Sequence, residues 1–254
     1  MLSALMWRKL NGTIKSYLDS EAYAWFDTNG LLDVYDGGVD VKTLDAMPSS
    51  IDQHIFWASS KMFALHAEKA PVAIIDMDLI IWKNLDSILA ANPLTVLHFE
   101  LFESCYVSKE ALKTRPGYTF DPEWNWTDAY PFNTGFAYFA DQAFKELFVE
   151  KAVDFMRDNR ERAQENVSQM VFAEQRLLSM LARQKGITTG RLIENPYDEH
   201  NDVFTHLWGA KRIARDNPEQ RAYLVRALMT KIRELDPVLY RKLKAIDPDQ
   251  TPGA

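Results

Sequence analysis

The chain has 254 residues, of which 47% are hydrophobic and 26% are charged. This composition is typical of a globular protein and excludes an intrinsically disordered chain. The net charge of −7 gives no electrostatic footprint for nucleic acid, so we expect no nucleic-acid partner. Cys105 is the single cysteine, which excludes a disulfide within the chain and leads us to expect a cytoplasmic protein.

Helical and extended patterns alternate along the first seventy residues. They predict a helix over 2–11, a strand over 13–18 ending at Asp19, a helix over 21–32, a turn at Gly37-Gly38, and a helix capped by Ser49, Ser50 or Asp52 that runs to Lys69. The apolar start is typical of a helix inside a domain rather than of a signal peptide. No apolar run is long enough to span a bilayer.

Two apolar runs follow that have the character of buried strands. Residues 72–75 come directly after Pro71 and form a continuous apolar run, which predicts a strand buried on both faces. Asp76 and Asp78 lie at its carboxyl end. Residues 94–99 form the second run, which ends at Glu100.

Residues 101–131 form a long, irregular segment rich in aromatic side chains. Loops of this length in compact domains usually serve a function. The aromatic side chains are candidates for stacking on sugar rings or for forming a lid, and a packed surface loop is an equally good interpretation. They are Tyr118, Phe120, Trp124, Trp126 and Tyr130.

The remainder alternates between strand and helix and ends in a helical tail. The patterns predict a strand over 136–139 opened by 132–135, helices over 141–159 and 165–184, a strand over 187–193, a helical tail over 218–246 broken near Asp236-Pro237, and eight frayed last residues. This alternation predicts an α/β fold with a mainly parallel sheet. We expect one domain over 1–254, with its core at about 13–211.

Asp76-Met77-Asp78 is the strongest candidate for a functional site. Two carboxylates that follow a buried strand can point to the same side where the strand enters a loop. Ligands of open α/β sheets bind at that edge. Carboxylate oxygens suit Mg²⁺ or Mn²⁺, which in turn bind ligand phosphates. The alternative is a solvated turn that contains the two residues by chance.

Further segments, taken in order, resemble the GT-A-fold nucleotide-sugar glycosyltransferases, especially the glycogenin- and galactosyltransferase-like group and its relatives. The resembling segments are residues 74–85, which contain the Asp-x-Asp, residues 132–136 with an Asn-x-Gly, residues 172–178, and residues 205–211 with a His-x-x-Gly-x-Lys. The resemblance covers about residues 13–211. It implies a GT-A-like three-layer sandwich and transfer of a sugar from a nucleotide-diphosphate donor.

The resemblance also implies roles for the residues of the Asp-x-Asp and His-x-x-Gly-x-Lys motifs. Asp76, Asp78 and His206 would bind Mn²⁺ or Mg²⁺ on the donor diphosphate. Gly209 and Lys211 would approach and neutralise that diphosphate, because a backbone without a Cβ atom can come close to a ligand.

Four other positions match the family at the sugar and acceptor side. Asn133 and Gly135 resemble the Asn-x-Gly that borders the donor sugar, with a tight turn into a strand as the alternative. Glu174 and Gln175 are candidate catalytic residues, and Glu174 is the candidate base for a sugar hydroxyl. A solvated helix face is the alternative for this pair.

Asp19 and Lys61 are further donor-binding candidates from the same resemblance. Asp19 resembles the acidic residue that follows a nucleotide-facing strand. Lys61 matches a basic position, although an exposed lysine explains it as simply.

The family's sheet normally begins with a nucleotide-binding strand before the first helix, and this sequence begins in what resembles that helix. The resemblance therefore predicts that this strand is lacking or that Met1 is a misplaced start. We expect a metal-dependent glycosyltransferase with a UDP-sugar donor, a glycan or other small acceptor, and no membrane span. The alternatives are a catalytically degenerate sugar- or protein-binding relative and a nucleotidyltransferase.

Overall fold

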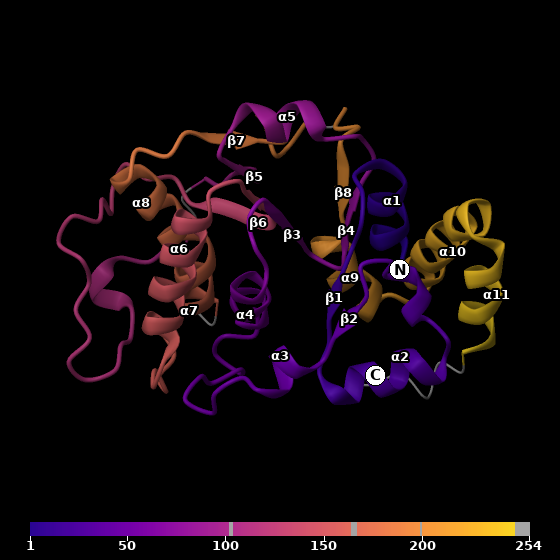
Figure 1. The fold of residues 1–254 in the computed structure, drawn as a ribbon, viewed down its shortest axis with the longest axis horizontal. Coiled ribbons are helices and arrows are strands. Elements are labelled where there is room, and N and C mark those ends of the chain that lie inside the picture. Colours follow the sequence, from indigo (N-terminus) through magenta and orange to yellow (C-terminus); the bar gives the residue numbers. More distant parts are fainter. Residues whose placement is uncertain (102–103, 164–166, 199, 247–254) are drawn as a thin grey trace. The chain divides into compact units, whose positions relative to one another are not determined.

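A computed structural model describes residues 1–101, 104–163, 167–198 and 200–246 of the chain (Figure 1). The chain divides into two compact units. The first unit comprises Met1–Asp45, Asp76–Leu85 and the chain from Asp202 onward, and the second comprises Ala46–Ile75 and Asp86–Asn201. Both contain helices and strands, so the protein is of mixed α and β structure. The expected single domain stays a prediction.

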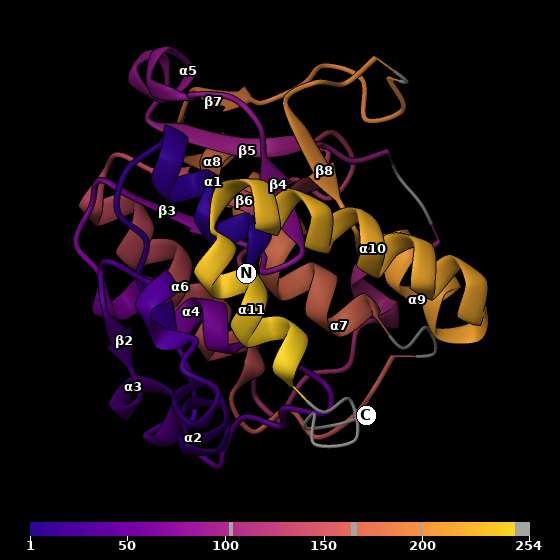
Figure 2. The same ribbon diagram turned by 90° about the vertical axis from the view of Figure 1, so that its right-hand side faces the viewer.

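The first unit contains two short two-stranded ladders and most of the terminal helices. Its elements are α1 (Leu2–Leu10), β1 (Ser16–Tyr17), α2 (Ser20–Thr28), a 3₁₀ turn (Leu32–Val34), β2 (Val39–Asp40), α3 (Lys42–Asp45), β4 (Leu79–Ile81), β8 (Phe204–His206), α9 (Trp208–Asp216), α10 (Pro218–Leu235) and α11 (Pro237–Ala245). Strands β1 and β2 are parallel, whereas β4 and β8 are antiparallel. Helix α1 packs against β4 and α10. Figure 2 shows α1, α10 and α11 of the first unit from the side that faces the viewer.

The core of the first unit joins the amino-terminal helix to the tail. Leu2 and Met6 of α1, Ile80 of β4, Ile232 of α10 and Leu239 of α11 are buried in one hydrophobic cluster. This cluster fixes β4 between helices that lie at opposite ends of the sequence.

The helical tail is interrupted where the sequence predicts. Asp236 caps α11 by accepting hydrogen bonds from the backbone N–H groups of Val238 and Leu239, and Pro237 opens the helix. Asn217 and Pro218 begin α10 in the same way. Within the described residues, no helix is both long and apolar enough to cross a bilayer.

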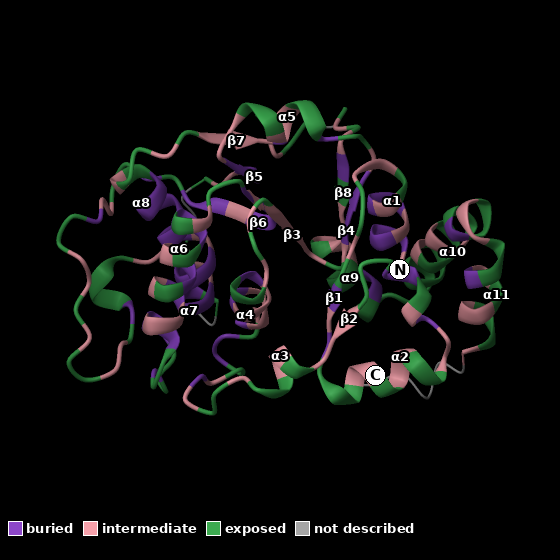
Figure 3. Cartoon of the chain, viewed as in Figure 1, coloured by how far each residue is buried: buried purple, intermediate pink, exposed green. Residues whose placement is uncertain are grey.

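The second unit is built around a four-stranded sheet in the order β3-β6-β5-β7. Its elements are α4 (Ser60–Ala67), β3 (Val72–Ile75), α5 (Asp86–Ala91), β5 (Leu94–Phe99), a 3₁₀ turn (Lys109–Ala111), β6 (Phe132–Phe139), α6 (Gln142–Met156), α7 (Ser168–Val171), a π-helical turn (Phe172–Arg176), α8 (Leu177–Gln184) and β7 (Thr189–Arg191). Figure 3 shows the buried residues of β6, α6 and α8 in purple. The start of the helix predicted from Glu165 lies outside the described residues.

The prediction of a mainly parallel sheet is wrong. Strand β6 pairs antiparallel with both β3 and β5, and only β5 and β7 are parallel in this sheet. Strand β3 is also not buried on both faces, because it lies at the end of the strand order and its four residues are half-buried. An apolar run predicts a strand but does not define its neighbours.

The helix predicted from Ser49–Asp52 to Lys69 is present only in its second half. Asp52 accepts backbone hydrogen bonds through its own carbonyl and its side chain, which closes a tight turn over His54–Phe56. Asp and Ser favour turns as well as helix caps. The helix begins at Ser60.

The aromatic segment packs as part of the second unit's core. Phe120 lies edge-on to Trp126 and Phe172, and Trp126 stacks on Phe172. Trp124 is only 5% exposed, whereas Tyr130 is 52% exposed. The packed-loop interpretation therefore holds for all of these rings except Tyr130.

We predict that Trp124→Ala lowers the free energy of unfolding by about 3–5 kcal/mol, because it leaves a large cavity in the core. Tyr130→Ala is the matched control and should change it by less than about 0.5 kcal/mol. Urea denaturation measures both. Equal, small effects would contradict the packing of this segment.

Candidate metal centre and a buried polar network

A tight turn positions the Asp-x-Asp motif. The N–H of Leu79 donates to the carbonyl of Asp76 at 3.0 Å, so residues 76–79 form a turn that leads into β4. Met77 at the centre of the turn is exposed, and the side chains of Asp76 and Asp78 on either side are partly buried. The turn therefore directs the Met77 side chain toward solvent and the two carboxylates toward a partly buried position.

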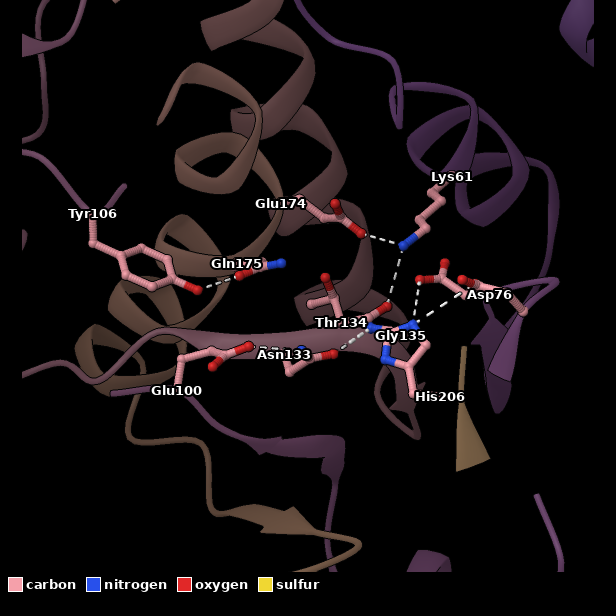
Figure 4. A network of polar contacts seen from close by, with 11 residues as sticks. Lys61, Asp76, Glu100, Tyr106, Asn133, Thr134, Gly135, Glu174, Gln175 and His206 are labelled. Carbon is pink, nitrogen blue, oxygen red and sulfur yellow. Dashed lines mark hydrogen bonds and ion pairs between the residues drawn. The ribbon is translucent and has the colours of Figure 1, made fainter. Parts of the chain in front are cut away.

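The pairing of β4 with β8 brings His206 to this turn. Leu79 is the register partner of His206, and the N–H of Leu207 donates to the carbonyl of Asp78 at 3.0 Å. His206 Nε2 lies 3.8 Å from Asp76 Oδ2 and 3.7 Å from Asp78 Oδ1. Figure 4 shows the imidazole directed at Asp76.

Lys211 completes the charge arrangement of this group. Its Nζ lies 2.6 Å from Asp78 Oδ2, one turn into α9 from His206. Burial favours the protonated form of Asp78, but the facing His206 and Lys211 groups outweigh it and hold the pKa of Asp78 well below its ordinary value. Because 3.7 Å is too long for a hydrogen bond from His206, we attribute most of this effect to Lys211.

The three side chains fit a single divalent cation. One potential ligand atom each from Asp76, Asp78 and His206 lies within 4.8 Å of the others. Carboxylate oxygens suit Mg²⁺ and Mn²⁺, and an imidazole nitrogen suits transition metals. The Lys211 ammonium competes for Asp78, but its side chain is mostly exposed and long enough to turn toward a ligand.

Two further candidates for donor binding, Gly209 and Asp19, lie in the first unit outside the metal-ligand group. Gly209 is the second residue of α9, and a Cβ atom added to it would have no neighbour within 4 Å. Asp19 caps α2 through a 2.7 Å hydrogen bond from the N–H of Ala22 and is not part of the metal-ligand group.

In the second unit, Lys61 and Glu174 form a largely buried ion pair. The Lys61 ammonium contacts Glu174 and also donates to the carbonyl of Thr134 (Figure 4). Glu174 is buried and the Lys61 side chain is only 19% exposed. The alternatives of an exposed lysine and a solvated helix face are therefore both wrong.

Asn133 and Gln175 extend this polar network through residues that the sequence did not single out. Asn133 donates to Glu100 Oε1 at 2.6 Å and accepts from the N–H of Gly135. Tyr106 donates to Gln175 Oε1. Asn133 and Gly135 lie inside β6, so the alternative of a turn before the strand is wrong.

Glu174 and Gln175 lie in the π-helical turn Phe172–Arg176, and such turns occur often at functional sites. The extra residue in the turn widens the helix locally. Glu174 contacts Lys61 and Gln175 contacts Tyr106, so two consecutive residues of the turn bind two different side chains.

Residues 1–217 match a family of unknown function, DUF6734. The chain belongs to this family. In this DUF6734 protein, the metal-ligand group and the polar network both lie within the matched residues, whereas α10 and α11 lie wholly beyond them. No curated protein and no solved structure matches the chain.

We predict that Lys61→Met lowers the free energy of unfolding by about 3 kcal/mol, because it leaves the Glu174 carboxylate buried without its cation. The double variant Lys61→Met/Glu174→Leu should recover most of this loss. Thermal or urea unfolding measures both variants.

Lys83→Met is the matched control, because Lys83 and Asp202 form an ion pair of 2.6 Å on the surface. It should cost less than about 1 kcal/mol. A double variant no more stable than Lys61→Met would contradict the buried-pair account.

Proposed function

We propose that this protein is a metal-dependent glycosyltransferase that takes a sugar from a nucleotide-diphosphate donor, with a UDP-sugar as the favoured donor. The grouping of Asp76, Asp78 and His206 carries the proposal. The sequence resemblance implies that these three residues bind one metal ion. Their proximity in the first unit supports the proposal. A GT-A-like three-layer sandwich is the fold that this proposal implies.

Each residue of the group has a chemical role in the proposal. Asp76, Asp78 and His206 would hold Mn²⁺ or Mg²⁺, which neutralises the leaving diphosphate. Lys211 would exchange its contact with Asp78 for a phosphate oxygen and so add a second positive charge. Its exposure allows this movement without disturbing the core.

Gly209 would contribute its backbone. It lies in the first turn of α9, where backbone N–H groups have no partner within the helix and can receive an anion. The open space around its Cα leaves room for a diphosphate.

The polar network of the second unit would bind the hydroxyl groups of a sugar or acceptor. Carboxylates and side-chain amides are suited to hydroxyl recognition, and Glu100, Asn133, Glu174 and Gln175 provide both. Glu174 as the base stays a prediction.

We predict that Asp76→Asn, Asp78→Asn and His206→Ala each reduce Mn²⁺ affinity and Mn²⁺-dependent UDP-sugar hydrolysis by more than about a hundredfold, since each removes a metal ligand. Calorimetry measures binding and product chromatography measures hydrolysis. Release of UDP and free sugar supports the proposal, whereas release of diphosphate from a nucleoside triphosphate would indicate a nucleotidyltransferase.

Asp216→Asn is the matched control, because Asp216 is an exposed acid at the end of α9 and lies outside the group. This variant should retain the Mn²⁺ affinity and the UDP-sugar hydrolysis of the wild type. Full hydrolysis by the three ligand variants in the presence of a chelator would refute the metal-dependent mechanism. Binding of Mn²⁺–UDP by the wild type without any hydrolysis would identify a binding protein instead.

We predict that Gly209→Ala stabilises the protein by about 0.5–1 kcal/mol while weakening Mn²⁺–UDP binding at least tenfold. Alanine is the better helix former and meets no neighbour here, but its methyl group occupies the space that the diphosphate requires. Unfolding and calorimetric titration separate the two effects. Unchanged affinity in a stabilised variant would remove Gly209 from the donor site.

A further inference from the structure

The charge of this chain is distributed very unevenly. Residues 208–246, which contain α9, α10 and α11, carry ten Lys and Arg but only four Asp and Glu, a net charge of +6. The whole chain carries −7, so the remainder is strongly acidic. The net charge therefore conceals a basic helical segment that the composition alone did not reveal.

Helix α9 presents part of this charge on one face together with an aromatic ring. Trp208, Arg212 and Arg215 are separated by four and three residues and so share a face of the helix. All three are exposed, and Trp208 is 73% exposed. Ala214, on another side of α9, is the buried residue that packs inward.

The neighbouring helix α10 continues the same combination of side chains. Tyr223 and Val225 are exposed large hydrophobic residues, and Arg221 and Arg226 beside them are exposed as well. Helices α9 and α10 pack against each other. Ile213 of α9 is also exposed, but it lies on a different side of that helix from Trp208. Figure 3 shows exposed residues of α10 in green.

We propose that the face of α9 formed by Trp208, Arg212 and Arg215 binds the surface of an anionic lipid bilayer. Basic residues are attracted to anionic headgroups, and an exposed Trp gains free energy at the boundary between headgroups and acyl chains. A polyanion such as DNA or heparin would satisfy the charges but would offer no acyl boundary for the exposed Trp208. The segment lies on the bilayer and does not cross it.

Adsorption of α9 to a bilayer would bring the metal-ligand group of the first unit close to the bilayer surface. Lys211 of α9 contacts Asp78, so the helix that adsorbs to the bilayer also borders the metal-ligand group. Charge and exposure alone predict this adsorption, whether or not the protein transfers sugars.

The test is co-sedimentation of the full chain with vesicles of phosphatidylcholine alone and with 30% phosphatidylglycerol at several salt concentrations. We expect binding only to the anionic vesicles, weakening as salt rises. Arg212→Ala/Arg215→Ala should weaken it by about 30-fold, since each basic residue near the surface contributes about a factor of five. Lys69→Ala/Lys185→Ala removes two exposed charges elsewhere and should leave it unchanged.

Tryptophan fluorescence supplies the second readout. Anionic vesicles should shift the emission of the wild type to the blue, and this shift should be lost in Trp208→Phe. Equal loss of binding in the two double variants, or absence of binding at low salt, would overturn the proposal. Binding to DNA or heparin at least as tight as to vesicles, without a Trp208 shift, would overturn it in favour of a soluble polyanion.

Discussion

The antiparallel pairing of β4 with β8 is the interaction on which the candidate metal centre depends. It is three residues long, yet it sets Leu79 opposite His206 and so brings Asp78 and the imidazole together. A slip of one residue would turn His206 to the opposite face of the ladder. The register is secured by the burial of β4, whose Ile80 is held in a core formed by α1, α10 and α11. Both ends of the described chain therefore contribute to the geometry of a site near residue 78.

Features encoded over short distances were predictable, and those that depend on distant pairing were not. Helices 2–10 and 142–156, the break at Asp236 and the strand before Asp76 all follow from local periodicity and capping. Strands β4 and β8 have three residues each, too few for a periodic pattern. Strand direction depends on which strands meet in space, and the apolar run in β3 resembles a buried parallel strand although it lies at a sheet edge.

The candidate site shows the same division. The Asp-x-Asp motif and the spacing of His206, Gly209 and Lys211 single out residues that the first unit places along β4, β8 and α9. Glu174 and Lys61 were candidates from the resemblance, but their burial was not predictable, because a charged residue on a helix is normally solvated. Their burial becomes favourable only when the two meet, which the sequence does not encode locally. Glu100 and Tyr106 were missed because their partners, Asn133 and Gln175, are distant in the sequence.

The edge position of β3 has a consequence for the behaviour of the protein in concentrated solution. A terminal strand carries backbone N–H and C=O groups that can pair with a strand of another molecule, which is a route to aggregation. β3 is only four residues long, follows Pro71 and ends at the acidic turn of Asp76 and Asp78. Short length and a preceding proline both oppose such pairing. Substitutions that lengthen β3 or remove Pro71 would therefore raise the tendency of the protein to aggregate.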